Sequence, residues 1–289
     1  MQSEIRFIPA EKITGAVKEL CIKANTCIGG DILGALEKAR SVETSPLALC
    51  VLETLLENAK IAEREKIPVC QDTGMAVVFI SLGRDVHIEG NIDEAVNEGV
   101  RQGYREGYCR SSVVRDPIKR ENTTDNTPAV IYYDFIDDDS AAASRQVRIT
   151  VAPKGFGSEN MSAVRMLNPS SGIAGVEEFI VETIKTAGAN SCPPVIAGVG
   201  LGGTMEKAAL LAKKALLREA GSVHPDPFWA EVEAHALGRI NALGIGPAGF
   251  GGKTTALGVH IISCPTHIAG LPAAVNIGCH ATRHGTVVL

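Results

Sequence analysis

The sequence contains few aromatic residues and no surplus of positive charge. Aromatics make up 4% of its 289 residues, and 28 lysines and arginines stand against 33 aspartates and glutamates, a net charge of −5. So few rings leave little for stacking nucleobases or for an aromatic belt at a membrane surface. The negative balance argues against a nucleic-acid partner bound through bulk positive charge, although a few local arginines could still bind an anionic substrate.

The cysteines form no C-x-x-C pair, so zinc ribbons, bacterial-type ferredoxins and thioredoxin-like motifs are unsupported. Any metal must therefore be held by cysteines from distant segments. The first residues also lack the basic region and apolar run of a secretory signal. We therefore expect a cytoplasmic protein with reduced thiols. Its eight cysteines are Cys21, Cys27, Cys50, Cys70, Cys109, Cys192, Cys264 and Cys279.

Residues 254–282 contain no lysine, arginine, aspartate or glutamate, and this stretch is long enough to span a bilayer. It nevertheless carries Pro265, Pro272, three histidines, two cysteines and Asn276. A buried segment that lines a site fits this composition better than a lipid-facing helix, so we expect no membrane partner. Fifteen of the 30 glycines fall between residues 196 and 285, which indicates close backbone approach or tight turns there.

A hydrophobic content of 45% and a charged content of 21% are ordinary for a soluble globular protein with a sizeable core. The patterns predict a mixed α/β fold in one domain, 1–289, with a helical part over about 1–65 and a sheet-containing body over about 66–289. Ser45-Pro46 and Asp226-Pro227 are typical helix starts. Further helices are expected after Asn91, after Gly172 and over about 204–219, and strands near 76–82, 129–136, 146–152, 255–263, 273–277 and 286–289.

Two glycine-rich motifs suggest nucleotide binding, but neither has the required context. Gly198–Gly203 matches G-x-G-x-x-G, yet no second strand ending in an acidic residue follows the next helix. A tight turn before a helix is the preferred interpretation. Gly249–Thr254 resembles part of a P-loop, but the position of its first glycine is occupied by Pro247.

Three cysteines lie beside Gly or Pro at the predicted ends of regular elements. Cys70 ends Ile-Pro-Val-Cys before a polar turn, Cys192 begins Cys-Pro-Pro after a helix, and Cys279 precedes a histidine. These are positions from which thiolates can point into a shared cavity. Cys21, Cys27 and Cys50 lie on predicted helical faces and are expected to be small buried hydrophobes.

Several motifs in the same order resemble the class I fumarate hydratases, which are iron–sulfur hydro-lyases. They are Ile67-Pro-Val-Cys-Gln-Asp-Thr-Gly74, Lys154-Gly-Phe-Gly-Ser-Glu-Asn160, Cys192-Pro-Pro194, Gly198–Thr204 and Pro265-Thr-His-Ile-Ala-Gly-Leu-Pro272 leading to Cys279-His280. The resemblance runs from the N-terminal helices to the last residues. It covers the α part of the enzyme only, and tartrate dehydratase α subunits share the same plan.

The resemblance implies a [4Fe-4S] cluster held by Cys70, Cys192 and Cys279. Three protein ligands leave one iron open to act as a Lewis acid, as in open catalytic zinc sites. Cys109 and Cys264 are not expected to be ligands, because Cys109 lies where related chains need no cysteine and Cys264 precedes a proline in a strand-like run.

The reaction implied by the resemblance is the reversible hydration of fumarate to malate, which requires a positioned acid or base for the proton. Asp72, two residues after Cys70, is the first candidate, and an Asx turn before Gly74 is its structural alternative. His267, 12 residues before Cys279, is the second candidate, and a hydrogen-bonded core histidine is its alternative.

A dianionic substrate needs cationic and amide donors. Arg110 matches a family arginine that contacts a carboxylate, although an ordinary surface arginine is the alternative. Gln71 and the backbone at Gly155 match further substrate contacts. Phe156 stands where many relatives have glycine, which weakens the inference for this loop.

The resemblance further implies a hetero-oligomer, in which a separate β subunit completes the site around a small dicarboxylate. Two other functions remain open. One is a tartrate dehydratase α subunit, and the other is a non-catalytic cluster-binding scaffold. The joint presence of Asp72, Arg110, His267 and the three cysteines argues against the scaffold.

Overall fold

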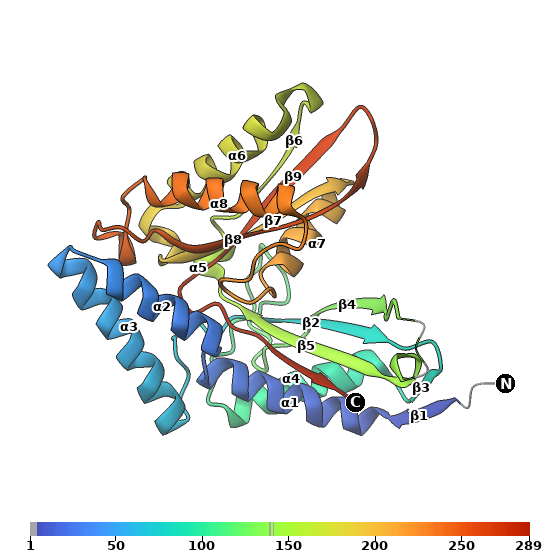
Figure 1. Cartoon of the computed structure of the whole chain (residues 1–289). Coiled ribbons are helices and arrows are strands. Elements are labelled where there is room, and N and C mark those ends of the chain that lie inside the picture. Colours follow the sequence, from blue (N-terminus) through green and yellow to red (C-terminus); the bar gives the residue numbers. More distant parts are fainter. Residues whose placement is uncertain (1–4, 139, 141) are drawn as a thin grey trace. The chain divides into compact units, whose positions relative to one another are not determined.

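The computed structural model describes residues 5–138, 140 and 142–289. The chain divides into two compact units, each assembled from separate stretches of sequence (Figure 1). The first unit comprises the residues up to Ile28, Ala59–Lys154 and Arg283–Leu289, and the second comprises Gly29–Asn58 and Gly155–Thr282. Each unit combines helices with a four-stranded sheet, which confirms the predicted mixed α/β fold.

The sheet of the first unit has the strand order β10-β5-β2-β4, in which β2 runs parallel to β4 and antiparallel to β5. Alternate residues of β2, Ala76, Val78 and Ile80, are buried in a core with side chains of helices α1 and α4, because successive strand residues face opposite sides. A short parallel pair, β1 and β3, completes this unit. Its elements are β1 (Arg6–Pro9), α1 (Ala10–Thr26), β2 (Met75–Leu82), β3 (Val86–Glu89), α4 (Ile92–Glu106), β4 (Val130–Phe135), β5 (Val147–Lys154) and β10 (Gly285–Val288).

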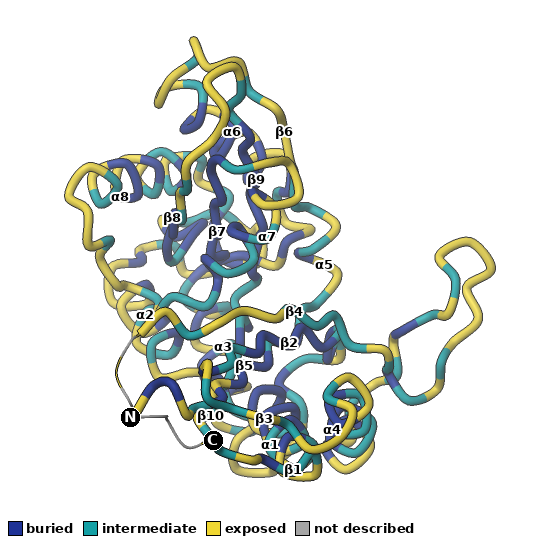
Figure 2. The backbone as a smooth tube through the Cα atoms, turned by 90° about the vertical axis from the view of Figure 1, so that its right-hand side faces the viewer, coloured by how far each residue is buried: buried dark blue, intermediate teal, exposed yellow. Residues whose placement is uncertain are grey.

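The sheet of the second unit has the order β6-β9-β7-β8, with β7 parallel to β8 and antiparallel to β9. Figure 2 shows the central strands β7 and β9 in the colour of buried residues. Helix α3 continues from this unit into the first. The elements are α2 (Gly30–Val42), α3 (Pro46–Glu65), α5 (Phe156–Glu159), β6 (Ala163–Leu167), α6 (Gly172–Ala187), β7 (Val195–Gly203), α7 (Met205–Ala215), α8 (Pro227–Asn241), β8 (Ala256–Thr266) and β9 (Leu271–Gly278).

The G-x-G-x-x-G motif lies within strand β7 and not in a turn, which corrects the expectation. Val195, Ala197, Val199 and Leu201 of this strand face a core shared with α6 and α8. The opposite face lies against α7, and the glycines permit that approach. A Cβ atom on Gly200 would stand 2.0 Å from the Ala208 carbonyl oxygen. The motif is therefore a helix-packing feature, with no dinucleotide loop.

We expect Gly200→Ala to destabilise the second unit, because the added methyl group collides with helix backbone that cannot rotate away. Overpacking of this kind costs about 1–3 kcal/mol or more. The matched control is Gly238→Ala in α8, where nothing lies within 4 Å of the added Cβ. This exposed helical position should gain about 0.5–1 kcal/mol. Denaturant unfolding of both variants tests the pair, and equal free energies of unfolding would contradict the packing argument.

Capping explains where several predicted helices begin. Asn91 accepts backbone hydrogen bonds from Asp93 and Glu94, and Asp226 accepts one from Phe228.

Helix α7 ends at Ala215, earlier than the predicted 219. Strands β1, β3 and β6 were not predicted. Among the described residues, no helix has the length and apolar character needed to cross a membrane.

In the segment that resembles a P-loop, Lys253 makes hydrogen bonds to residues at the junction between α2 and α3. Lys253 donates from its backbone N–H to the Glu43 carboxylate (2.7 Å) and from Nζ to the Val42 carbonyl (2.9 Å). Glu43 also accepts from the backbone N–H groups of Thr44 and Ser45. The loop therefore anchors the junction between α2 and α3, which accounts for its lysine without a nucleotide.

Candidate functional site

The segment that carries Cys70 and Asp72 forms a tight turn before strand β2 of the first unit. The Asp72 carboxylate accepts a hydrogen bond from the Gly74 backbone N–H (3.0 Å), so the Asx-turn alternative describes the local geometry. Gly74 has φ +76°, and a Cβ there would come within 2.7 Å of the Lys154 backbone. Only glycine fits this position, and the turn is thereby fixed.

Within this turn the Asp72 backbone N–H lies 3.4 Å from the Cys70 Sγ, as a hydrogen-bond donor to sulfur. Cys70 and Asp72 are half-buried and Gln71 is exposed. The turn therefore presents a thiol, an amide and a carboxylate on three consecutive residues.

The carbonyl oxygens of the same turn are held by buried donors. The Tyr104 hydroxyl donates to the Thr73 carbonyl (3.0 Å) and also lies 3.2 Å from the Gly74 carbonyl, to which Asn126 Nδ2 donates (3.2 Å). Tyr104 and Asn126 are both buried. Because their polar groups are satisfied by the turn, displacing it would leave them unpaired in the interior.

Arg110 lies directly beside this turn. The Thr73 hydroxyl accepts from the Arg110 backbone N–H (2.9 Å) and lies 3.3 Å from the Arg110 carbonyl oxygen. The Arg110 side chain is exposed. The structure therefore brings four predicted residues, Cys70, Gln71, Asp72 and Arg110, together in the first unit.

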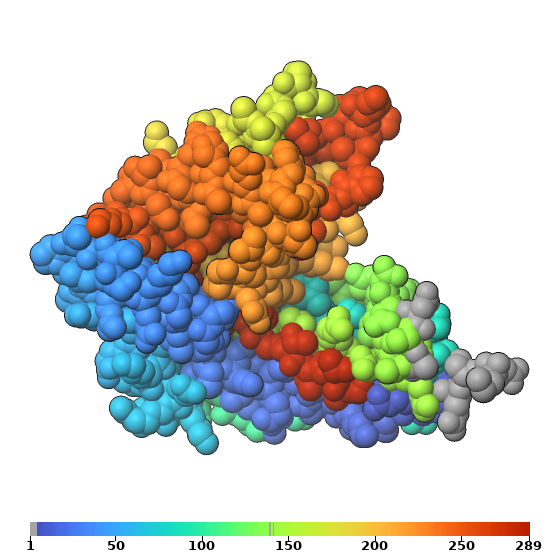
Figure 3. All heavy atoms as spheres, in the orientation of Figure 1, coloured from blue at the N-terminus to red at the C-terminus, as the bar shows by residue number. Residues whose placement is uncertain are grey.

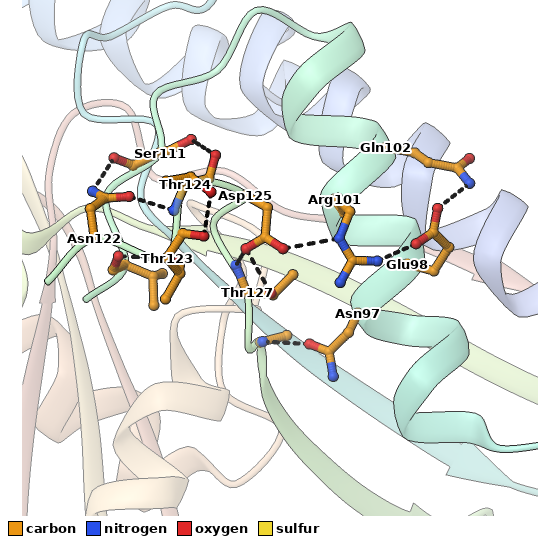
Figure 4. A network of polar contacts seen from close by, with 12 residues as sticks. Asn97, Glu98, Arg101, Gln102, Ser111, Asn122, Thr123, Thr124, Asp125 and Thr127 are labelled. Carbon is orange, nitrogen blue, oxygen red and sulfur yellow. Dashed lines mark hydrogen bonds and ion pairs between the residues drawn. The ribbon is translucent and has the colours of Figure 1, made fainter. Parts of the chain in front are cut away.

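The segment after Arg110 extends from the body of the unit between α4 and β4 (Figure 2) and is fixed by a polar network (Figure 4). Arg101 of α4 donates to Asp125 (2.9 Å), which also accepts from the Thr127 hydroxyl (2.7 Å). Burial alone would raise the pKa of Asp125, but the hydrogen bonds from Thr127 and Arg101 outweigh it and lower the pKa to about 2. The loop that bears Arg110 thus has a charged anchor at its base.

Cys192 and Cys279 lie close together at one end of the second unit's sheet. Cys279 follows directly on β9, whose last residue, Gly278, pairs with Ile196 of β7. Cys192 precedes β7 with φ 53° and ψ 63°, and it is exposed. The His280 backbone N–H donates to the Cys192 carbonyl (3.2 Å), and His280 Nδ1 lies 3.1 Å from the same oxygen.

Gly155 belongs to the same end of this unit. It precedes α5, which packs against both β9 and the 3₁₀ turn Gly188–Ser191 before Cys192. Glu159 of α5 accepts from Lys213 (2.7 Å) and from Asn276 Nδ2 (2.9 Å), and Asn276 lies three residues before Cys279. This network ties the Gly155 loop to both cysteine segments.

His267 lies at the opposite end of the same sheet. It is exposed in the loop between β8 and β9. This loop lies at the upper right of Figures 1 and 3. Its Nδ1 accepts from the Ala269 backbone N–H (3.2 Å). Strand β9, eight residues long, separates it from Cys279, and such a strand spans roughly 25 Å. Within one chain His267 and Cys279 therefore lie at opposite ends of β9, and the catalytic role of His267 stays a prediction.

The remaining cysteines differ in burial. Burial raises the pKa of the Cys109 thiol to about 11, which favours its protonated form. Cys264 of β8 lies near the His267 end of its sheet, away from Cys192. Cys21 is buried as predicted, Cys27 is half-buried, and Cys50 is exposed, which corrects the expectation for it. Within the described ranges, no three His, Cys, Asp or Glu side chains gather as ligands of a single ion would.

Sequence reasoning missed the buried residues that hold these segments. Asn25, Tyr104 and Asn126 are single polar residues within otherwise ordinary helices or loops, and nothing in the sequence marks them. Arg283 had a signal that could have been used. It is the first charged residue after the uncharged stretch 254–282, four positions after Cys279.

The two units define an α/β protein in which the candidate residues Cys70, Asp72, Cys192 and Cys279 lie in turns or loops next to strands. The family model for fumarate hydratase (Fumerase) matches residues 14–288. This chain therefore belongs to the fumarate hydratase family, as the motifs predicted.

Its relatives include α subunits of tartrate dehydratases. A protein of Methanocaldococcus jannaschii, provisionally named L(+)-tartrate dehydratase subunit alpha, is 42% identical over 274 residues, or 94% of this chain and 95% of its own length. The L(+)-tartrate dehydratase subunit alpha of Escherichia coli K12 is 32% identical over 280 residues, or 96% and 91%. The similarity therefore extends along nearly the whole of each chain.

Proposed function

We propose that this chain is the α subunit of an iron–sulfur hydro-lyase that interconverts fumarate and malate. The observation that carries the proposal is the match of the fumarate hydratase family over residues 14–288, with cysteines present in the three motif positions. The chain's own residues then have roles that follow from their placement.

The donor set fits an iron–sulfur cluster. Cys70, Cys192 and Cys279 stand at the ends of regular elements, and thiolates are the ligands that such clusters require. Cys70 has a backbone N–H within reach of its sulfur, and the Cys192 and Cys279 segments are joined through His280. When bound, the cluster supplies an iron without a protein ligand that acts as a Lewis acid.

Asp72 is the proposed acid/base residue, because it follows Cys70 by two positions and its carboxylate is half-buried and oriented by the Gly74 N–H. It would hold the proton that leaves or joins the carbon beside the hydroxyl-bearing one. His267 remains a second candidate only if another chain supplies it, since β9 separates it from Cys279 of its own chain.

Arg110 is proposed to bind a substrate carboxylate, because its guanidinium is exposed beside the turn of Asp72 and can make two parallel hydrogen bonds. Gln71 is exposed on the same turn and can donate its amide to the second carboxylate or the hydroxyl. The backbone at Gly155, beside the Cys192 and Cys279 segments, is proposed as a further contact.

A second substrate is favoured by a separate observation. Both relatives compared above are named as tartrate dehydratase α subunits. L-Tartrate differs from malate by one hydroxyl group, so the same acid/base and carboxylate-binding groups would serve its dehydration. The names also support the proposal of a partner, since an α subunit implies a β subunit that completes the enzyme.

We expect the cluster-loaded chain alone to be inactive and the complex with its β subunit to be active. The test assays fumarate, L-malate and L(+)-tartrate with the anaerobically purified chain before and after adding the β subunit. The β subunit alone is the control. Turnover of tartrate with little turnover of malate would assign the second substrate. A full rate from the isolated chain would overturn the need for a partner, and a loaded complex inactive on all three substrates would favour a scaffold.

A further inference from the structure

Arg283 is a buried arginine whose contacts lead to the turn of Cys70 and Asp72. It is 6% exposed, although arginine is rarely buried unless its donors are used. Its Nη2 donates to the Asp72 carbonyl oxygen at 2.6 Å, and its Nε donates to Asn25 Oδ1 at 3.2 Å. One guanidinium therefore bridges the turn and helix α1.

Asn25 makes this bridge rigid. It has 0% exposure, and its Nδ2 donates to the Cys21 carbonyl one helical turn earlier (3.0 Å). Its backbone carbonyl accepts from the Val69 N–H (2.9 Å), directly before Cys70. Asn25 and Arg283 thus hold the chain on both sides of Cys70, one at residue 69 and the other at residue 72.

The arrangement determines which groups of the turn face outward. The carbonyls of Asp72, Thr73 and Gly74 all accept hydrogen bonds from buried donors. Arg283 donates to the first, Tyr104 to the second and Asn126 to the third. With these oxygens fixed in the interior, the side chains of Cys70, Gln71 and Asp72 remain on the partly exposed side. The Asp72 N–H also keeps its approach to the Cys70 sulfur.

We propose that Arg283 is a positioning residue for the active site: held by Asn25, its guanidinium fixes the Asp72 carbonyl and so orients both Cys70 and Asp72. This inference rests on the proposed function for the roles of those two residues. Arg283 touches neither substrate nor cluster in this proposal. An arginine is required because its planar fork reaches two acceptors in different directions, whereas a lysine ammonium is a compact donor on a flexible stem.

The experiment compares Arg283→Lys and Arg283→Gln with the wild type in the complete α/β enzyme. The readouts are iron content, kcat and KM per loaded cluster, and amide hydrogen exchange of residues 72–74. Residues that orient metal ligands typically contribute about 10–100-fold to activity. We expect kcat per cluster to fall by about that factor in Arg283→Gln and less in Arg283→Lys, with KM nearly unchanged and faster exchange in the turn.

The matched control is Arg218→Gln. Arg218 is also a partly buried arginine with a carboxylate partner, Glu233, but it belongs to the second unit and does not contact the turn. Its replacement should leave kcat per cluster and exchange at residues 72–74 at wild-type values. A lower melting temperature in both Arg283 variants with normal kcat per cluster would reduce Arg283 to a structural residue and overturn the proposal.

Hydrogen exchange separates this proposal from the assignment of the reaction, because exchange does not depend on the substrate. If the wild-type complex hydrates none of the dicarboxylates, the proposed function fails, and the exchange of residues 72–74 still tests the tether. Unchanged exchange in both Arg283 variants would overturn the tether whatever the reaction is. Faster exchange with unchanged kcat would show that the tether does not orient the catalytic groups, which also overturns the proposal.

Discussion

Cys192→Ser should yield a folded chain that holds no intact cluster and gives a complex without activity. Serine offers a hard oxygen that stays protonated at neutral pH, and it cannot replace a soft thiolate as an iron ligand. Because Cys192 is exposed and its segment is held through backbone groups, the substitution removes no core packing. Iron and sulfide content, visible absorbance and turnover measure the effect.

The control for this variant is Cys264→Ser. Cys264 is in the same unit but lies toward the other end of its sheet, and it should keep both iron and turnover. A melting temperature near that of the wild type in Cys192→Ser would show that cluster loss is not a consequence of unfolding. An active, iron-loaded Cys192→Ser complex would remove Cys192 from the ligand set.

Asp72→Asn should keep the cluster and lose most of the turnover. The asparagine Oδ1 can accept the same hydrogen bond from the Gly74 N–H, so the turn and the position of Cys70 are preserved. What is lost is the ability to exchange a proton, and general acid–base groups contribute about 10²–10⁴-fold to rate. Single-turnover and steady-state kinetics per loaded cluster measure this loss.

A second aspartate offers a matched comparison for Asp72. Asp116 also caps a turn through its carboxylate, which accepts from the backbone N–H groups of Ile118 and Lys119 (2.9 and 2.7 Å). Asp116→Asn is therefore the same chemical change in a similar turn away from Cys70. Asp116→Asn should stay within a few-fold of wild type. Equal rates for the two variants would move the proton-transfer role to the partner chain or to His267 supplied by another copy.

Hydrophobic periodicity was sufficient for most helices and for the longer strands. Helices α1 and α3 and strand β2 were predicted from local pattern alone, since each buries one face or alternates over many residues. The short strands were not. Strand β1 pairs with β3 some 80 positions later, and β6 pairs with β9 more than 100 positions later, so neither is specified by its own few residues.

For the site, motifs predicted which residues lie in turns but not how the turns are held. Gly198–Gly203 was expected to form a turn because glycine permits one, whereas the packing of α7 is what requires glycine there. His267 and Cys279 are only 12 residues apart in sequence, and only the structure shows that strand β9 holds them at opposite ends of the sheet. The contacts of Arg283 and Asn25 join residues 258 positions apart, which no local pattern encodes.

The discontinuous assembly of the first unit has a consequence for the order in which the protein is made. Its sheet receives an edge strand, β10, only from residues 285–288, and its turn at Asp72 receives Arg283 from the same late segment. On the ribosome the long stretch 155–282 of the second unit therefore emerges before the first unit can close. When Cys70, Cys192 and Cys279 have all been synthesised, the chain still lacks Arg283, which holds the turn of Cys70 in the folded protein.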